Sequence, residues 1–232
     1  MQKIPQTKEE LAARIDHTNL KPTAAKEDIL KTVAEALKYG FRGVCVPLYW
    51  VPTVKEALRN SGILLVAPVG FPLGYTSSEA KAFEAEWAKK HGADEIDMVM
   101  NISAFKSRDY QTVKEDIEAV IKAASPIPVK VIIETSYLTP DEISLASKIA
   151  VEAGAKFVKT NTGFGPRGAA LDDVKIIYKA IGNKAKIKAA GGIRDALTAL
   201  KFIAAGADVI GASAGVRIVE TFDKKILEKL NL

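Results

Sequence analysis

Lysines occur inside three short apolar segments of the chain, at Lys130, Lys159 and Lys188, where a charge is costly to bury. Aspartates occur in two similar segments, at Asp16 and Asp97. A second ammonium group nearby in a poorly hydrated cleft lowers the pKa of a lysine, and the neutral amine can then attack a carbonyl carbon. These residues therefore indicate Schiff-base chemistry. Either Lys159 or Lys188 would be the nucleophile and the other would perturb it, and Asp97 would transfer protons.

Each of these residues also has an ordinary structural interpretation. Lys159 can extend from a strand end to solvent, and Lys130 can pair with Glu134. Asp16 can cap the turn that follows it. Cys45 lies in another apolar segment and, taken alone, is better explained as a small buried hydrophobic side chain. The case for chemistry therefore depends on whether the fold brings these side chains together.

A recurrent pattern predicts the elements that would position them. Apolar residues at helical spacing are followed by a glycine and then by a short apolar run, and the glycines are Gly40, Gly62, Gly92, Gly154, Gly182 and Gly206. Glycine readily adopts the left-handed conformation that ends a helix. Prolines at Pro126 and Pro128 end one further helix. Successive stops lie roughly 20–30 residues apart, which is the length of one βα unit.

With an opening strand at 14–16, this pattern gives eight strands and predicts an α/β protein, a single (β/α)8 TIM barrel with one domain over residues 1–232. A doubly wound open sheet is the alternative, but it more often has about five to seven strands. Helices are predicted over 77–91, 109–124 and 141–153, with starts at Ser77, Thr139 and Asp172. Because the strands of a barrel end at a common face, the lysines and aspartates are expected to converge there.

Two glycine-rich turns near the end of the chain predict a phosphate site. Residues 189–194 and 211–215 place glycines and small residues directly before predicted helices. Backbone N–H groups at such helix starts bind phosphate, and the loops after strands seven and eight of a barrel are a common place for it. The alternative is that these glycines only permit tight turns. A match to G-x-G-x-x-G at 163–168 is not interpreted as a dinucleotide site, because Lys186 and Lys188 stand where an acidic residue is needed.

Composition limits the partners and the compartment. The net charge of +5 comes without a long basic run, which argues against nucleic acid and suits a phosphorylated substrate. A single cysteine excludes an internal disulfide and fits a reducing cytoplasm. The N-terminus lacks the apolar core of a signal peptide, and the longest apolar region, 62–75, contains two prolines, so no membrane contact is expected. Only two histidines are present, so no metal site is predicted.

Several motifs together resemble the deoxyribose-phosphate aldolase family. They cover nearly the whole chain, at 15–22, 43–46, 69–74, 95–99, 130–135, 157–160, 189–194 and 211–213. The resemblance implies a class I aldolase on a (β/α)8 barrel, without metal or cofactor. Such an enzyme reversibly cleaves 2-deoxy-D-ribose 5-phosphate into acetaldehyde and D-glyceraldehyde 3-phosphate, in the catabolism of deoxyribonucleotides. Members are often dimers or tetramers, so a cytoplasmic homo-oligomer is expected.

The resemblance also assigns roles by position. Lys159 matches the Schiff-base lysine, Lys188 matches the residue that lowers its pKa, and Asp97 matches the proton-transfer group. Substrate binding is assigned to Asp16, Cys45, Lys130, Thr160, Gly163, Gly191, Gly192, Gly211 and Ser213. The chain departs from many relatives in its phosphate region, at Asn161, Arg167 and Ala214.

Two other functions remain open at this point. A different phosphosugar enzyme, such as an isomerase or a metal-dependent lyase, would depend on a histidine or glutamate base or lose activity with a chelator. A non-enzymatic phosphometabolite-binding protein would bind the sugar phosphate almost as well without Lys159. Turnover and covalent labelling of Lys159 separate both from a class I aldolase.

Overall fold

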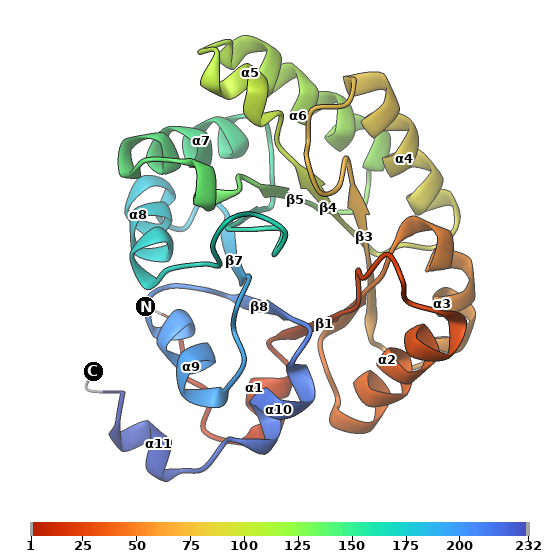
Figure 1. The fold of residues 1–232 in the computed structure, drawn as a ribbon, viewed down its shortest axis with the longest axis vertical. Coiled ribbons are helices and arrows are strands. Elements are labelled where there is room, and N and C mark those ends of the chain that lie inside the picture. Colours follow the sequence, from red (N-terminus) through yellow and green to blue (C-terminus); the bar gives the residue numbers. More distant parts are fainter. Residues whose placement is uncertain (1, 231–232) are drawn as a thin grey trace.

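Eight parallel strands form a closed barrel in a computed structural model that describes residues 2–230 (Figure 1). Each strand pairs with the next one along the chain, and β1 pairs with β8 to close the barrel. The strands are β1 (Ile15–Thr18), β2 (Gly43–Cys45), β3 (Leu64–Val69), β4 (Glu95–Val99), β5 (Val129–Ile132), β6 (Phe157–Lys159), β7 (Lys186–Ala190) and β8 (Val209–Ala212). The predicted (β/α)8 barrel is therefore confirmed, and the open sheet is excluded.

Helices follow each strand and cover the outside of the barrel (Figure 1). They are α2 (Lys26–Tyr39), α3 (Val51–Ala57), α4 (Ser78–Lys90), α6 (Tyr110–Ala124), α7 (Pro140–Glu152), α8 (Leu171–Ile181), α9 (Ala196–Ala204) and α10 (Gly215–Glu220). Outside this repeating pattern lie α1 (Lys8–Ala12), α5 (Ile102–Lys106), α11 (Lys225–Glu228) and the 3₁₀ helices η1 (Leu48–Trp50) and η2 (Thr135–Tyr137). In residues 2–230 no helix is both long enough and apolar enough to cross a membrane.

Local sequence signals explain most of the helix boundaries. The six predicted stop glycines all have positive φ angles, between 56° and 122°, and each precedes a strand. Ser77 and Thr139 accept hydrogen bonds from the first turns of α4 and α7, as predicted. The predicted start of α8 at Asp172 is wrong by one residue. The helix begins at Leu171, because the Asp173 carboxylate accepts the N–H of Ala170 and fixes the first turn there.

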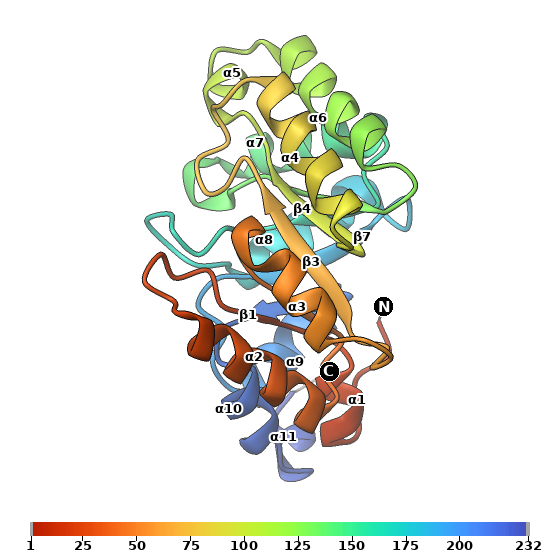
Figure 2. The same ribbon diagram turned by 90° about the vertical axis from the view of Figure 1, so that its right-hand side faces the viewer.

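The register of the strands brings the charged positions to one level of the barrel. Asp97 on β4 pairs with Lys130 on β5, and Lys159 on β6 pairs with Lys188 on β7. Asp16 on β1 pairs with Gly211 on β8. The sequence predicts Asp16 and Lys188 at strand ends, but both lie inside their strands, because β1 continues to Thr18 and β7 continues to Ala190. Figure 2 shows that the loops after β1 and β6 project from the side opposite the N-terminus.

Alternation along β4 separates an apolar layer from a charged one. Ile96 and Met98 belong to the buried apolar cluster that also includes Ile117 of α6, between strands and helices. Glu95 and Asp97 alternate with them, and their carboxylates are buried inside the barrel. The middle of a TIM barrel is ordinarily filled by branched apolar side chains. Charged groups at that level therefore mark the interior as the place to look for a site.

Candidate active site

Six charged side chains form a closed circuit of alternating sign inside the barrel, which we call the charge ring. In order around the circuit they are Arg42, Asp16, Lys188, Asp97, Lys130 and Glu95. The oppositely charged atoms of successive members lie between 2.6 and 2.8 Å apart. Three cations balance three carboxylates, so each buried charge has two partners of opposite sign.

Lys159 is a fourth cation attached to this ring. Its Nζ lies 2.8 Å from Asp97 Oδ2, the same oxygen that Lys188 contacts at 2.8 Å. Because the ring is already neutral, Lys159 adds a positive charge that has no carboxylate of its own within the described residues. The two ammonium groups that the sequence singles out therefore do meet, and they meet on Asp97.

Access to substrate distinguishes the two lysines. Lys159 is one of the residues that line a cavity of about 530 Å³ at the carboxyl ends of the strands. Lys188 does not line this cavity and its side chain is fully buried. Sequence spacing left the choice of nucleophile open. The geometry favours Lys159, since of these two lysines it is the one that lines the space where a carbonyl compound could bind.

The electrostatics of the ring keep Asp16, Asp97 and Lys188 ionised. Burial alone would raise the pKa of Asp16, but Lys188, Lys130 and Arg42 outweigh it and lower that pKa to about 2. Burial opposes ionisation of Asp97 too, yet the surrounding ammonium groups hold the pKa of its carboxyl well below the usual range. For Lys188, burial alone would lower the pKa, and attraction to Asp16 and Asp97 raises it above its ordinary value. Lys188 is therefore held as an ammonium ion.

Ionisation of Asp16 links this ring to folding stability. The pKa of Asp16 is about 2 in the folded protein, below its ordinary value of 3.8. A carboxyl group with a depressed pKa stabilises the fold fully above its unfolded-state pKa. That contribution is present at neutral pH and is lost as the pH falls from 3.8 toward 2.

The cavity contains the glycine-rich turns predicted to bind phosphate. Its lining includes Gly163, Gly191, Gly192, Gly211 and Ser213. The N–H groups of Gly163, Gly192 and Ser213 donate no hydrogen bond to another group within residues 2–230. They are therefore available to an anion. The predicted phosphate residues thus lie in the same cavity as Lys159.

Three of the other predicted substrate-binding residues lie behind the cavity wall. Asp16 and Lys130 belong to the charge ring and do not line the cavity. Cys45 is fully buried, and burial raises the pKa of its thiol to about 11, so it is a neutral thiol near pH 7. Its position agrees with the ordinary interpretation of a small buried side chain.

Thr160 also lies behind the wall and connects β6 to β7. Its hydroxyl donates to the carbonyl oxygen of Ala190 and accepts the N–H of Ala190, each at 3.0 Å. These bonds hold the end of β7 directly before Gly191 and Gly192. Thr160 thus positions the turn rather than facing the cavity.

Glu134 does not pair with Lys130, which rejects the structural alternative for Lys130. Its carboxylate accepts bonds from Asn161 Nδ2 at 2.7 Å, Ser136 Oγ at 2.7 Å and the N–H of Thr162 at 2.9 Å. Lys130 instead contacts Glu95 and Asp97, because the register places β5 beside β4. Glu134 therefore secures the loop that carries Thr162 and Gly163 into the cavity wall.

The residues at which the chain departs from its relatives have structural partners. Asn161 is buried and accepts from Thr135 Oγ1 at 3.0 Å. Arg167 pairs with Asp173 at 2.6 Å and donates to the carbonyl oxygen of Thr135 at 2.9 Å, outside the cavity. Ala214 directly precedes α10. Arg167 thus braces the loop after β6 and does not contact the predicted phosphate region.

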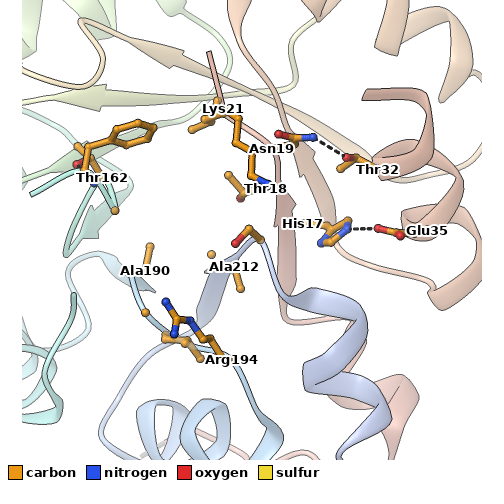
Figure 3. Close-up of a pocket in the computed structure, with 18 of the residues that line it drawn as sticks. His17, Thr18, Asn19, Lys21, Thr32, Glu35, Thr162, Ala190, Arg194 and Ala212 are labelled. Atoms are coloured by element: carbon orange, nitrogen blue, oxygen red, sulfur yellow. Dashed lines mark hydrogen bonds and ion pairs between the residues drawn. The ribbon is translucent and has the colours of Figure 1, made fainter. Parts of the chain in front are cut away.

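Several residues that shape the site were not assigned from the sequence. Figure 3 shows His17, Asn19 and Arg194 around the cavity, and Glu35 behind His17. His17 Nδ1 and Asn19 Oδ1 are buried and have no hydrogen-bond partner within the described residues. The sequence does contain a signal for Glu95, since this residue lies two positions before Asp97 and therefore on the same face of the strand. The sequence contains no such signal for Arg42, because this residue precedes β2 and its role depends on contacts across the barrel.

Metal coordination has no support in residues 2–230, where no group of three or more His, Cys, Asp or Glu side chains could hold a metal ion. Glu95 and Asp97 are paired with cations of the charge ring. Asp94, the neighbouring carboxylate, pairs with Lys55 at 3.0 Å.

Replacing Gly211 by alanine is expected to reduce turnover by about 10- to 100-fold, because small displacements of reacting groups have effects of that size. A Cβ at Gly211 would lie 2.9 Å from Lys188 Cε and 3.0 Å from Ala190 Cβ. Lys188 would shift and carry Asp97 with it. The measurement is kcat and KM at pH 7 with the unfolding midpoint as control. A wild-type kcat in a folded variant would show that the position of Lys188 does not matter.

A family model and individual relatives both match this chain over most of its length. A model of the DeoC/LacD family of aldolases matches residues 11–221. A deoxyribose-phosphate aldolase from Thermococcus kodakarensis is 52% identical over 217 residues, covering 92% of this chain and 97% of the relative. One from Thermus thermophilus is 48% identical over 210 residues, covering 90% and 96%.

A solved structure shows the same fold. It is described as a unique tetrameric structure of deoxyribose phosphate aldolase from Aeropyrum pernix, and it superposes with a TM-score of 0.87 at 34% identity. The match covers 93% of this chain and 92% of that chain. Sequence and fold therefore lead to one group of enzymes.

Proposed function

The chain belongs to the DeoC/LacD family of aldolases, and from this membership we propose that it is a class I aldolase acting on 2-deoxy-D-ribose 5-phosphate. The products are acetaldehyde and D-glyceraldehyde 3-phosphate, and the reaction is reversible. The observation that carries the proposal is the position of Lys159, which lines the cavity and whose amine contacts the carboxylate it shares with Lys188.

Charge balance makes Lys159 the group that can supply a neutral amine. Each member of the charge ring has two oppositely charged partners, and loss of any one charge leaves a buried group uncompensated. Lys159 can lose its proton without unbalancing the ring. Lys188, only one carboxylate oxygen away, opposes a second ammonium ion at that place.

The reaction then follows Schiff-base chemistry. Lys159 Nζ attacks the C1 aldehyde of the open-chain sugar, water leaves, and a protonated imine forms. The C2–C3 bond breaks, its electrons form an enamine, and the C3 hydroxyl loses a proton as D-glyceraldehyde 3-phosphate departs. Protonation at C2 and addition of water release acetaldehyde and restore the amine.

Asp97 and water divide the proton transfers. Asp97 Oδ2 is 2.8 Å from Lys159 Nζ, so this carboxylate exchanges protons with the lysine nitrogen. Asp97 itself does not line the cavity, so protons at C2 and at the C3 hydroxyl pass through water held beside Lys159. Asp16 and Lys130 hold this arrangement through the charge ring.

The rest of the cavity accommodates the sugar phosphate. The phosphate binds the free N–H groups of Gly163, Gly192 and Ser213, with Gly191 and Gly211 providing close approach. His17 and Asn19 line the same cavity and lie beside the bound sugar. The tetrameric relative from Aeropyrum pernix supports a homo-oligomer, and the single cysteine fits the reducing cytoplasm.

The test is reductive trapping. Incubation with acetaldehyde and borohydride should reduce the imine and attach an ethyl group to Lys159, identified by peptide mass spectrometry. Inorganic phosphate without acetaldehyde is the control and should leave Lys159 unmodified. Labelling of Lys188 instead, or of neither lysine while the enzyme turns over, would contradict the proposal.

A further inference from the structure

Arg42 directly precedes β2, on the opposite side of the charge ring from Asp97. Its guanidinium contacts Asp16 Oδ1 at 2.8 Å and Glu95 through two bonds, at 2.6 and 2.9 Å. The side chain is 17% exposed, and the mechanism above assigns it no task. Asp16 and Glu95 are the two carboxylates of the ring that Lys159 does not touch.

Counting charges shows what Arg42 contributes to the site. With Arg42 the ring has three cations and three carboxylates, and Lys159 is in excess. Without Arg42 the ring would keep two cations, Lys130 and Lys188, against three carboxylates. The Lys159 ammonium would then become the third cation needed for neutrality. A buried carboxylate without a counter-charge is costly, so loss of the proton from Lys159 would be opposed.

We propose that Arg42 is a positioning residue that supplies the third positive charge of the ring and thereby leaves Lys159 as the cation that can release its proton. This inference rests on the proposed function, in which the neutral amine of Lys159 is the nucleophile. It extends that function by giving a residue outside the cavity control over the pH range in which the amine is available.

The other ionisable groups around the ring do not replace Arg42. Cys45 on β2 is a neutral thiol near pH 7, because burial raises its pKa to about 11. The Nζ atom of Lys186 on β7 lies 5.6 Å from the centroid of the aromatic ring of Phe157, which Arg42 and Lys130 also approach. Lys186 contacts no carboxylate within residues 2–230. Strands β3 and β8 contribute no ionisable side chain. Besides Lys188 on Asp16 and Lys130 on Glu95, Arg42 is therefore the one cation within residues 2–230 that contacts these two carboxylates.

Two single variants are expected to move the pH profile of kcat/KM in opposite directions. Arg42→Met keeps a long side chain but removes the charge, so the acidic limb should move to higher pH by about one unit or more, a tenfold loss at a pH on that limb. Glu95→Gln removes a carboxylate and leaves a second excess cation. Its acidic limb should move to lower pH. A residue that only packs would not give shifts of opposite sign.

The double variant Arg42→Met/Glu95→Gln completes the test, because it restores a neutral ring of two cations and two carboxylates. Its acidic limb should return most of the way to that of the wild type, and Arg42→Lys should stay close to the wild type throughout. An unshifted limb in folded Arg42→Met overturns the inference. So does a double variant whose loss is the sum of the two single losses.

Two further measurements keep the outcomes distinct. Glu95→Gln tests the sign of the shift even if Arg42→Met fails to fold. An acidic limb of Glu95→Gln that stays in place or moves to higher pH also overturns the inference. Trapping of Lys159 by acetaldehyde and borohydride in the wild type tests the proposed function separately. If Lys159 is trapped in the wild type but the pH profiles of the variants are not shifted, Schiff-base catalysis is supported and the proposed role of Arg42 is wrong.

Discussion

Replacing Lys159 by alanine is expected to lower kcat/KM for cleavage of 2-deoxyribose 5-phosphate by about 10⁴-fold or more, because removing a covalent nucleophile abolishes the main pathway. The same change should cost little stability. Lys159 is the excess cation on Asp97, and without it the charge ring retains three cations and three carboxylates. The measurements are steady-state turnover and urea unfolding.

Lys159→Arg is the matched control for this prediction. Arginine keeps a positive charge beside Asp97 and stays protonated, so it cannot form the imine. Activity should be as low as that of the alanine variant, while the sugar phosphate should still bind to the turns at Gly191 and Ser213. Turnover within about tenfold of the wild type in either variant would remove Lys159 from the mechanism. Chelator-sensitive turnover would instead favour a metal-dependent lyase.

Replacing Lys188 by leucine is expected to reduce both activity and stability. Its ammonium contacts Asp16 at 2.6 Å and Asp97 at 2.8 Å inside the barrel. Removing one partner of a buried ion pair costs about 3–5 kcal/mol, because the remaining charge is left uncompensated. Activity should fall by about 10²- to 10⁴-fold, since Asp97 loses its position and Lys159 becomes the balancing cation.

A second substitution separates the effects on folding and on chemistry. Lys188→Leu/Asp16→Asn removes one charge of each sign and should regain much of the lost stability, as measured by the urea midpoint. A single Lys188→Leu variant that unfolds at the wild-type urea concentration would show that the charge ring does not stabilise the fold. The pair of lysines is thus distinguished by stability: Lys159 variants keep it and Lys188→Leu loses it.

The fold followed from patterns that are local in the sequence. Gly40, Gly92 and Gly206 follow helix ends because glycine readily adopts positive φ angles, and each of these ends leads into a strand. Eight such units are enough to close a barrel. The lysines and aspartates could also be placed on strands from the sequence, since a charge inside a short apolar run stands out against its neighbours.

The assignment of partners did not follow from the sequence. Lys130 pairs with Glu95 and Asp97 rather than Glu134, and Arg42 closes the charge ring from a position with no motif. These contacts cross between strands, and they depend on register and on the stagger of a closed barrel. A linear pattern contains neither of these quantities.

The sequence by itself determined that this chain forms a (β/α)8 barrel with lysine and aspartate side chains in its strands. Only the tertiary structure decided that Lys159 reaches the cavity while Lys188 stays buried as an ammonium ion. The physical reason is that the reactivity of a buried amine is set by the sum of the charges around it. That sum exists only when the closed barrel brings β1, β4, β5, β6, β7 and Arg42 around one interior.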